Sequence, residues 1–219
     1  MAVAQELRRL SASARPLLKN RDDQRLTMAA QELETWFQSN RPGPFSWTID
    51  PVVETEESTS YQGQGGAHAV SARFTFLWIC ERTDDPTLVG AARGGTNVVI
   101  RRNGSDAGKY HFDLCAGGNE PQSEVMHCFS HAQVDGRTSF PRFPSVLLLP
   151  SDVLEMLLFE LWPSGWQGVV DKNRNGLLGH HRAQRIRLTR VARAFQHLAT
   201  KRYPLVSLHA PLSESIRLF

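Results

Sequence analysis

Two neighbouring segments of the chain carry histidines and an aspartate at alternating positions. His111 and Asp113 alternate with apolar residues in the first segment, and His127 and His131 share one parity in the second. A β-strand places such alternating residues on one face. If the two strands pair so that partner residue numbers add to an even sum, both sets lie on the same face, whereas an odd sum separates them. The sequence leaves this register open.

In the even register these side chains would gather within reach of one metal ion. Neutral imidazoles together with a carboxylate suit zinc or manganese, and a bound metal can lower the pKa of a water molecule to make a hydrolytic nucleophile. The candidate metal ligands are His111, Asp113, His127 and His131. Their spacing matches no established metal motif. The simpler interpretation is therefore a polar sheet face on which the histidines hydrogen-bond to neighbours or water.

The sequence contains no Gly-x-Ser-x-Gly elbow, no His-Glu-x-x-His helix and no kinase signature. No catalytic residue can therefore be assigned, and whether the protein is an enzyme stays open.

A second feature is the basic character of the C-terminal part. Residues 1–171 carry 15 basic and 21 acidic side chains, a net charge of −6, whereas residues 172–219 carry ten basic and one acidic side chain, a net charge of +9. Such a split indicates an acidic partner for the basic part. The candidate residues for binding nucleic acid or an acidic protein are Arg182, Arg185, Arg187, Arg190, Arg193, His197, Lys201 and Arg202. The alternative is that the basic segment packs on the acidic body or is simply solvated.

The elements that must position these residues follow from periodicity. Apolar residues at helical spacing predict two helices within 1–45 and a nearly all-apolar helix from about 151 to 162. A last helix is expected from about 180 to 200, with an apolar stripe of Leu188, Val191, Phe195 and Leu198 opposite the arginines.

Four strands are predicted in between, over 72–80, 96–102, 109–115 and 126–134, with Asn103-Gly104 as a hairpin turn. Both faces of 72–80 are apolar, so we expect this strand to be covered on both sides. Short connections favour antiparallel pairing. The sequence thus predicts an α+β fold with a mostly antiparallel sheet of four to five strands. Two N-terminal and two C-terminal helices would pack on it. We expect one domain over 1–219, with a helical segment 1–45, a sheet 66–145 and C-terminal helices 150–219.

Composition narrows the class further. The chain has 219 residues, is 41% hydrophobic and 21% charged, and contains three cysteines without a Cys-x-x-Cys pair. An odd number of cysteines makes a disulfide framework improbable and favours a reducing compartment. The N-terminus lacks the apolar stretch of a secretory signal, and no apolar run is long enough to cross a bilayer. We therefore expect a cytoplasmic protein with no membrane partner.

Two functions are compatible with these patterns. The first is a non-catalytic binding protein, a subunit of a larger assembly, that engages nucleic acid or an acidic protein through its basic C-terminal helix. The second is a metal-dependent hydrolase, such as a phosphodiesterase or nuclease, that uses the His/Asp cluster on the sheet. We favour the first, because of the charge split and the absence of catalytic motifs.

Overall fold

The computed structural model describes residues 2–39, 41–59, 62–63, 66–84, 89–115, 130–135, 143–144 and 148–200. The helical elements are α1 (Ala2–Ala14), the short 3-10 helix η1 (Arg15–Leu17), α2 (Asp22–Gln38), α3 (Pro150–Leu161), α4 (Pro163–Lys172) and α5 (Arg174–Thr200). The strands are β1 (Phe45–Thr48), β2 (Val53–Glu54), β3 (Gln62–Gly63), β4 (Gly66–Ala67), β5 (Val70–Arg82), β6 (Val89–Arg102), β7 (Ser105–Cys115), β8 (Ser130–Asp135) and β9 (Phe143–Pro144). The predicted α+β class is confirmed.

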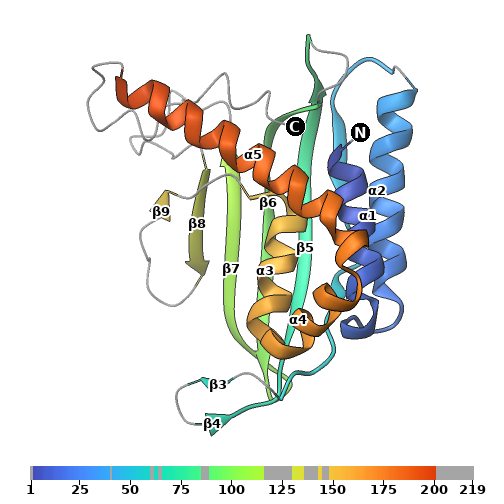
Figure 1. The fold of residues 1–219 in the computed structure, drawn as a ribbon, viewed down its shortest axis with the longest axis vertical. Coiled ribbons are helices and arrows are strands. Elements are labelled where there is room, and N and C mark those ends of the chain that lie inside the picture. Colours follow the sequence, from blue (N-terminus) through green and yellow to red (C-terminus); the bar gives the residue numbers. More distant parts are fainter. Residues whose placement is uncertain are drawn as a thin grey trace.

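The main sheet is antiparallel throughout, in the order β1-β5-β6-β7-β8-β9, and β2 also pairs with β5 (Figure 1). Its centre is a long meander of β5, β6 and β7. The predicted turn at Asn103-Gly104 joins β6 to β7, and both of its residues have positive φ angles, as a tight two-residue hairpin requires.

The sheet has seven strands rather than the expected four to five. The additional strands include β1 and β2, which precede the range 66–145 that we assigned to the sheet. Both are too short to show clear alternation. Of the predicted fourth strand, residues 126–129 lie outside the described part, and β8 begins at Ser130.

All the α-helices of the described chain lie on one side of the main sheet (Figure 1). The side chains of β5 reflect this arrangement. Phe74, Phe76 and Trp78 point into the core and are almost fully buried, whereas Leu77 on the opposite face is 50% exposed. The expectation that this strand is covered on both sides therefore fails at Leu77, and none of the described α-helices lies over that face. An apolar residue on each face does not require a second layer, because isolated exposed apolar side chains are common.

The core lies between this face of the sheet and the helices. Leu7 and Leu10 of α1, Leu26 and Leu33 of α2, and Leu154 of α3 are each no more than 1% exposed. Burying one such side chain contributes about 1.5–3 kcal/mol. The contacts formed by α1, α2 and α3 therefore anchor the helical layer.

The C-terminal helices follow the predicted order but not the predicted boundaries. The buried helix α3 ends at Leu161, and a further helix, α4, begins at Pro163. Helix α5 then begins at Arg174, six residues before the expected start at about 180. At the joint between α4 and α5, the Asn173 amide donates a hydrogen bond to the Ser13 hydroxyl of α1 at 2.6 Å, which ties the start of α5 to the body.

Within the part of the chain that the structure describes, none of the helices has the length and apolar character needed to cross a membrane.

Candidate functional site

Helix α5 presents a row of arginines to solvent. Arg174, Arg182, Arg185 and Arg193 are all exposed, and the 3.6-residue period places them on one side of the helix. We call these four residues the arginine face. Within the described part of the chain, none of them lies within 4.0 Å of a carboxylate in an ion pair. Their charges are therefore not neutralised by the acidic residues that the structure describes.

Large aliphatic side chains accompany the arginine face. Leu178, Ile186 and Leu188 are each about half exposed on α5. Leu188 was expected to contribute to a buried apolar stripe, so that prediction was wrong for this residue. The side chains of the other three predicted stripe residues lie outside the described part. The exposed surface of α5 is therefore both cationic and partly apolar.

The structure gives different positions to the remaining predicted basic residues. Arg187, expected at the border of the basic surface, is 4% exposed and turns into the protein instead. The side chains of Arg190 and His197, and all of Lys201 and Arg202, lie outside the described residues.

Arg187 is buried because two carboxylates compensate its charge. Its Nη1 donates to both carboxylate oxygens of Glu6 at 3.0 Å, and its Nη2 donates to Oδ1 of Asp152 at 2.5 Å. Asp152 also accepts a hydrogen bond from the Leu149 amide at the start of α3. On its buried side, α5 therefore binds α1 through Glu6 and α3 through Asp152 in ion pairs.

About two turns before Arg187 on α5, two consecutive histidines meet a single carboxylate. Nε2 of His180 lies 2.8 Å from Oε2 of Glu155, and Nε2 of His181 lies 2.8 Å from Oε1. The Gln184 amide donates to Oε2 of the same carboxylate at 2.8 Å. Burial of Glu155 acts to raise its pKa, but the hydrogen bonds and positive charge supplied by the histidines and Gln184 outweigh it and lower the pKa to about 2. In the described chain, these residues form the one group of three or more His, Cys, Asp or Glu side chains able to hold a metal ion.

Sequence reasoning missed this cluster. Glu155 lies 25 residues before His180 in the sequence, and only the adjacent pair His180-His181 was visible as a signal. The deeper partner, Glu6, comes from the other end of the chain. Its pKa is raised by burial, against the lowering effect of Arg187.

The predicted cluster on the sheet is brought together in part. Strands β7 and β8 pair in the even register, with His111 opposite Gln133 and Asp113 opposite His131. Nε2 of His111 lies 3.0 Å from Oε1 of Gln133 and 3.5 Å from Oδ2 of Asp113. The side chain of His131 and the whole of His127 lie outside the described residues.

Asp113 owes its position to a glycine on the neighbouring strand. A Cβ atom on Gly95 would lie 2.1 Å from Oδ1 of Asp113, so the carboxylate occupies the space above the glycine. This cluster faces away from the helices, on the same side of the sheet as Leu77.

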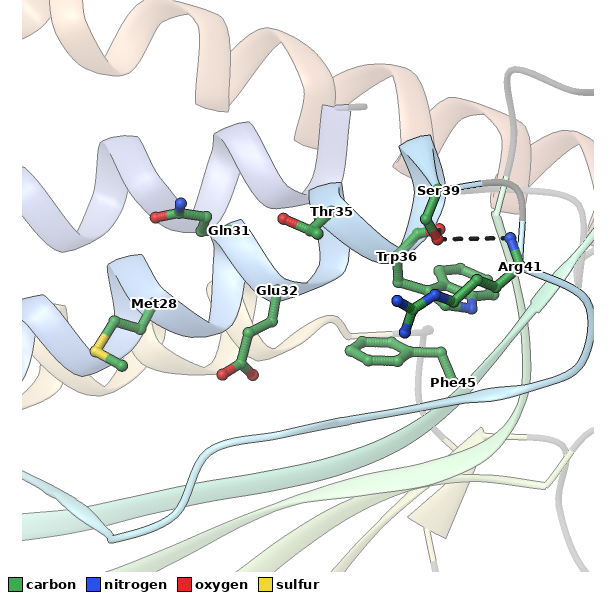
Figure 2. Close-up of a pocket in the computed structure, with 8 residues that line it drawn as sticks. All are labelled: Met28, Gln31, Glu32, Thr35, Trp36, Ser39, Arg41 and Phe45. Atoms are coloured by element: carbon green, nitrogen blue, oxygen red, sulfur yellow. Dashed lines mark hydrogen bonds between the residues drawn. The ribbon is translucent and has the colours of Figure 1, made fainter.

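A surface pocket of about 480 Å³ lies where the end of α2 meets β1 (Figure 2). The rings of Trp36 and Phe45 are stacked at one end, with centroids 5.3 Å apart, and the Glu32 carboxylate lies further along α2. The Arg82 guanidinium lies 4.9 Å from the centre of the Trp36 ring. The pocket supplies aromatic surface with one carboxylate and the Arg41 guanidinium, but its lining contains no histidine or cysteine.

A second hollow, of about 320 Å³, lies between α3 and the inner face of β6 and β7. Its walls are mainly apolar, with Phe112 and Leu157 among them, and its polar groups are the Tyr110 phenol and the Glu160 carboxylate. Neither hollow contains any of the charged clusters described above.

Comparison of the chain with models of protein families, with curated proteins and with solved structures found no match. The functional conclusions therefore depend on the residues themselves.

Proposed function

We propose that this protein is a non-catalytic binding module whose helix α5 docks onto an acidic, partly apolar surface of a partner protein. The observation that carries the proposal is the arginine face: four exposed arginines on one side of a helix, none paired with a carboxylate in the described chain. Arginine is well suited to this role because its planar guanidinium binds carboxylates in a bidentate manner.

The charge distribution supports an electrostatic attraction. The segment from residue 172 onwards carries a net charge of +9, whereas the rest of the chain carries −6. A concentrated charge of one sign speeds the encounter with a partner of the opposite sign and orients the two molecules.

The exposed aliphatic residues favour a protein partner over nucleic acid. Leu178, Ile186 and Leu188 would gain little from a phosphate backbone, which is recognised by cationic and hydrogen-bonding groups. Protein interfaces, by contrast, combine apolar contacts at the centre with arginine as one of their enriched residues. The combination of exposed arginine and aliphatic side chains on α5 matches a protein interface rather than a nucleic-acid interface.

Two defined probes test the proposal. The first is an amphipathic helical peptide made of glutamate and leucine, and the second is oligothymidylate. We expect the peptide to bind more tightly than oligothymidylate. The double substitution Arg182→Glu/Arg185→Glu should weaken peptide binding by at least about tenfold, because two attractive contacts become repulsive. Ile186→Ser should weaken peptide binding by about fivefold through lost apolar contact.

A matched control makes the same change in total charge at another place on the chain. The variant Arg15→Glu/Arg21→Glu makes the same change in net charge at two exposed arginines of the N-terminal part and should bind the peptide like the wild type. Tighter binding of oligothymidylate, unaffected by Ile186→Ser, would show that the arginine face recognises nucleic acid instead. Failure of the peptide to bind, or equal loss in the control variant, would refute the docking proposal.

The hydrolase remains a second candidate, supported by one observation. The even register of β7 and β8 pairs Asp113 with His131 and leaves His111 on the same face, which is the arrangement that this function needs. Its test is hydrolysis of bis(p-nitrophenyl) phosphate with added manganese or zinc. Activity that disappears in both His111→Ala and His131→Ala would support it, and activity equal to that of the metal alone would refute it.

A further inference from the structure

The histidine cluster at the base of α5 has a polar atom without a partner. His180 is 0% exposed, and its Nδ1 atom accepts or donates no hydrogen bond in the described structure. Nδ1 lies 3.7 Å from Oε2 of Glu6, on the side of the ring away from Glu155. One ring nitrogen of His180 is therefore buried without a hydrogen bond, which is an energetically costly state.

The ligand set suits a transition metal. Two imidazole nitrogens and one carboxylate oxygen, from His180, His181 and Glu155, lie within 4.8 Å of one another. In a tetrahedral zinc site the bonds are about 2.0–2.1 Å long, which puts neighbouring ligand atoms about 3.3 Å apart. Oε2 of Glu155 already lies 2.8 Å from Nε2 of His180, and Oε1 lies 2.8 Å from Nε2 of His181. Small rotations of these side chains would therefore allow an ion between them.

The surroundings provide the outer contacts of such a site. A histidine that binds a metal through one nitrogen usually directs the other towards a carboxylate, which orients the ring. The Glu6 carboxylate lies on the Nδ1 side of the His180 ring and can orient it in this way. Gln184 donates to Glu155 and also to Asp152, and so fixes the orientation of the ligating carboxylate.

The charge of the cluster also calls for a cation. Glu6, Asp152 and Glu155 form ion pairs or hydrogen bonds in one connected network with a single arginine, Arg187. Three carboxylates against one guanidinium leave two negative charges that either protons on the histidines or a divalent ion must compensate, and this compensation matters most where the side chains are withdrawn from water.

We propose that Glu155, His180 and His181 form a binding site for a divalent metal ion of the zinc class. The ion would join α3 to α5 and hold the helix that carries the arginine face. Three protein ligands leave one position for water, and the side chain of His181 is 35% exposed, which gives the ion a route from solvent. This site differs in every residue from the candidate cluster on the sheet.

Titration of the chelator-treated full chain with zinc chloride, followed by calorimetry and elemental analysis, tests the proposal. We expect one zinc ion per chain. His181→Ala and Glu155→Gln should each weaken binding by at least about 100-fold, because each removes one of three ligands. Glu6→Gln should weaken binding by about 10- to 100-fold while one ion per chain is still bound, as expected for a residue that orients a ligand.

His68→Ala is the matched control, since it removes a histidine that belongs to neither candidate metal cluster and should leave zinc affinity unchanged. Circular dichroism checks that each variant is folded. His181→Ala should be tolerated because this side chain is partly exposed. Absence of zinc uptake by the wild type, uptake unchanged in both His181→Ala and Glu155→Gln, or loss of uptake in His68→Ala would overturn the proposal. In the first two cases the cluster would be an ion pair between histidine and glutamate.

Discussion

Removal of the Arg187 side chain should destabilise the protein strongly. This guanidinium is 4% exposed and donates hydrogen bonds to Glu6 and Asp152, which belong to two other helices. In Arg187→Ala, both carboxylates would lose their positive partner. Breaking a buried ion pair by removing one member costs about 3–5 kcal/mol, because the remaining charge stays buried without compensation.

Urea denaturation followed by tryptophan fluorescence and circular dichroism measures this loss. A decrease of about 3–5 kcal/mol in the free energy of unfolding corresponds to a fall in melting temperature of roughly 6–20 °C for a domain of this size. Arg185→Ala is the matched control. It removes an exposed arginine from the same helix and should change the free energy of unfolding by no more than about 0.5 kcal/mol.

A double-mutant cycle tests the cause of the effect. The double variant Glu6→Gln/Arg187→Met should lose less free energy of unfolding than the sum of the losses in Glu6→Gln and Arg187→Met. The reason is that the double variant removes both charges of this ion pair, whereas each single variant leaves one of them buried without its partner. If Arg187→Ala costs under about 1 kcal/mol, like Arg185→Ala, the buried network does not hold α5 in place and this reasoning is refuted.

Two further predictions follow from the same structure. The pKa of Glu155 is lowered from 4.5 to about 2, so its charged form stabilises the fold above pH 4.5 and this contribution is lost as the pH falls from 4.5 towards 2. Urea titrations should show a loss of roughly 3 kcal/mol in the wild type over this range that is absent in Glu155→Gln; parallel pH profiles would contradict it. Gly94→Ala should destabilise the protein by about 1–3 kcal/mol, because the new Cβ would lie 2.6 Å from the Leu77 carbonyl oxygen at a positive φ angle. Gly104→Ala, which also has a positive φ but meets open space, should cost less in thermal denaturation, and equal losses would argue against the steric explanation.

The fold was predictable from the sequence where local patterns determine structure. The alternation of Phe74, Phe76 and Trp78 indicated a core-facing strand, and Asn103-Gly104 indicated the hairpin between β6 and β7. Both signals act over a few residues. By contrast, the same alternation did not reveal that none of the described α-helices covers the other face of β5, because the presence of a covering layer depends on where the helices pack.

The arrangement around α5 was less predictable for a different reason. An arginine at position 187 looks the same in sequence whether it faces solvent or a buried carboxylate. Its partner Glu6 lies 181 residues away, in a helix whose position relative to α5 is set by the whole core. The even register of β7 and β8 was likewise undetermined, since side-chain parity alone permits both pairings.

The proposed function leads to one direct measurement, the NMR spectrum of arginine side-chain NεH groups during addition of the glutamate–leucine peptide. We expect shifts for Arg182, Arg185 and Arg193, which are exposed on one side of α5, and no shift for Arg187, whose guanidinium is already bound by Glu6 and Asp152. Arg15, on the N-terminal part, should also be unaffected. Shifts at Arg15 equal to those at Arg182 and Arg185, or no shifts on α5 at all, would contradict the claim that the arginine face is a docking surface for an acidic protein.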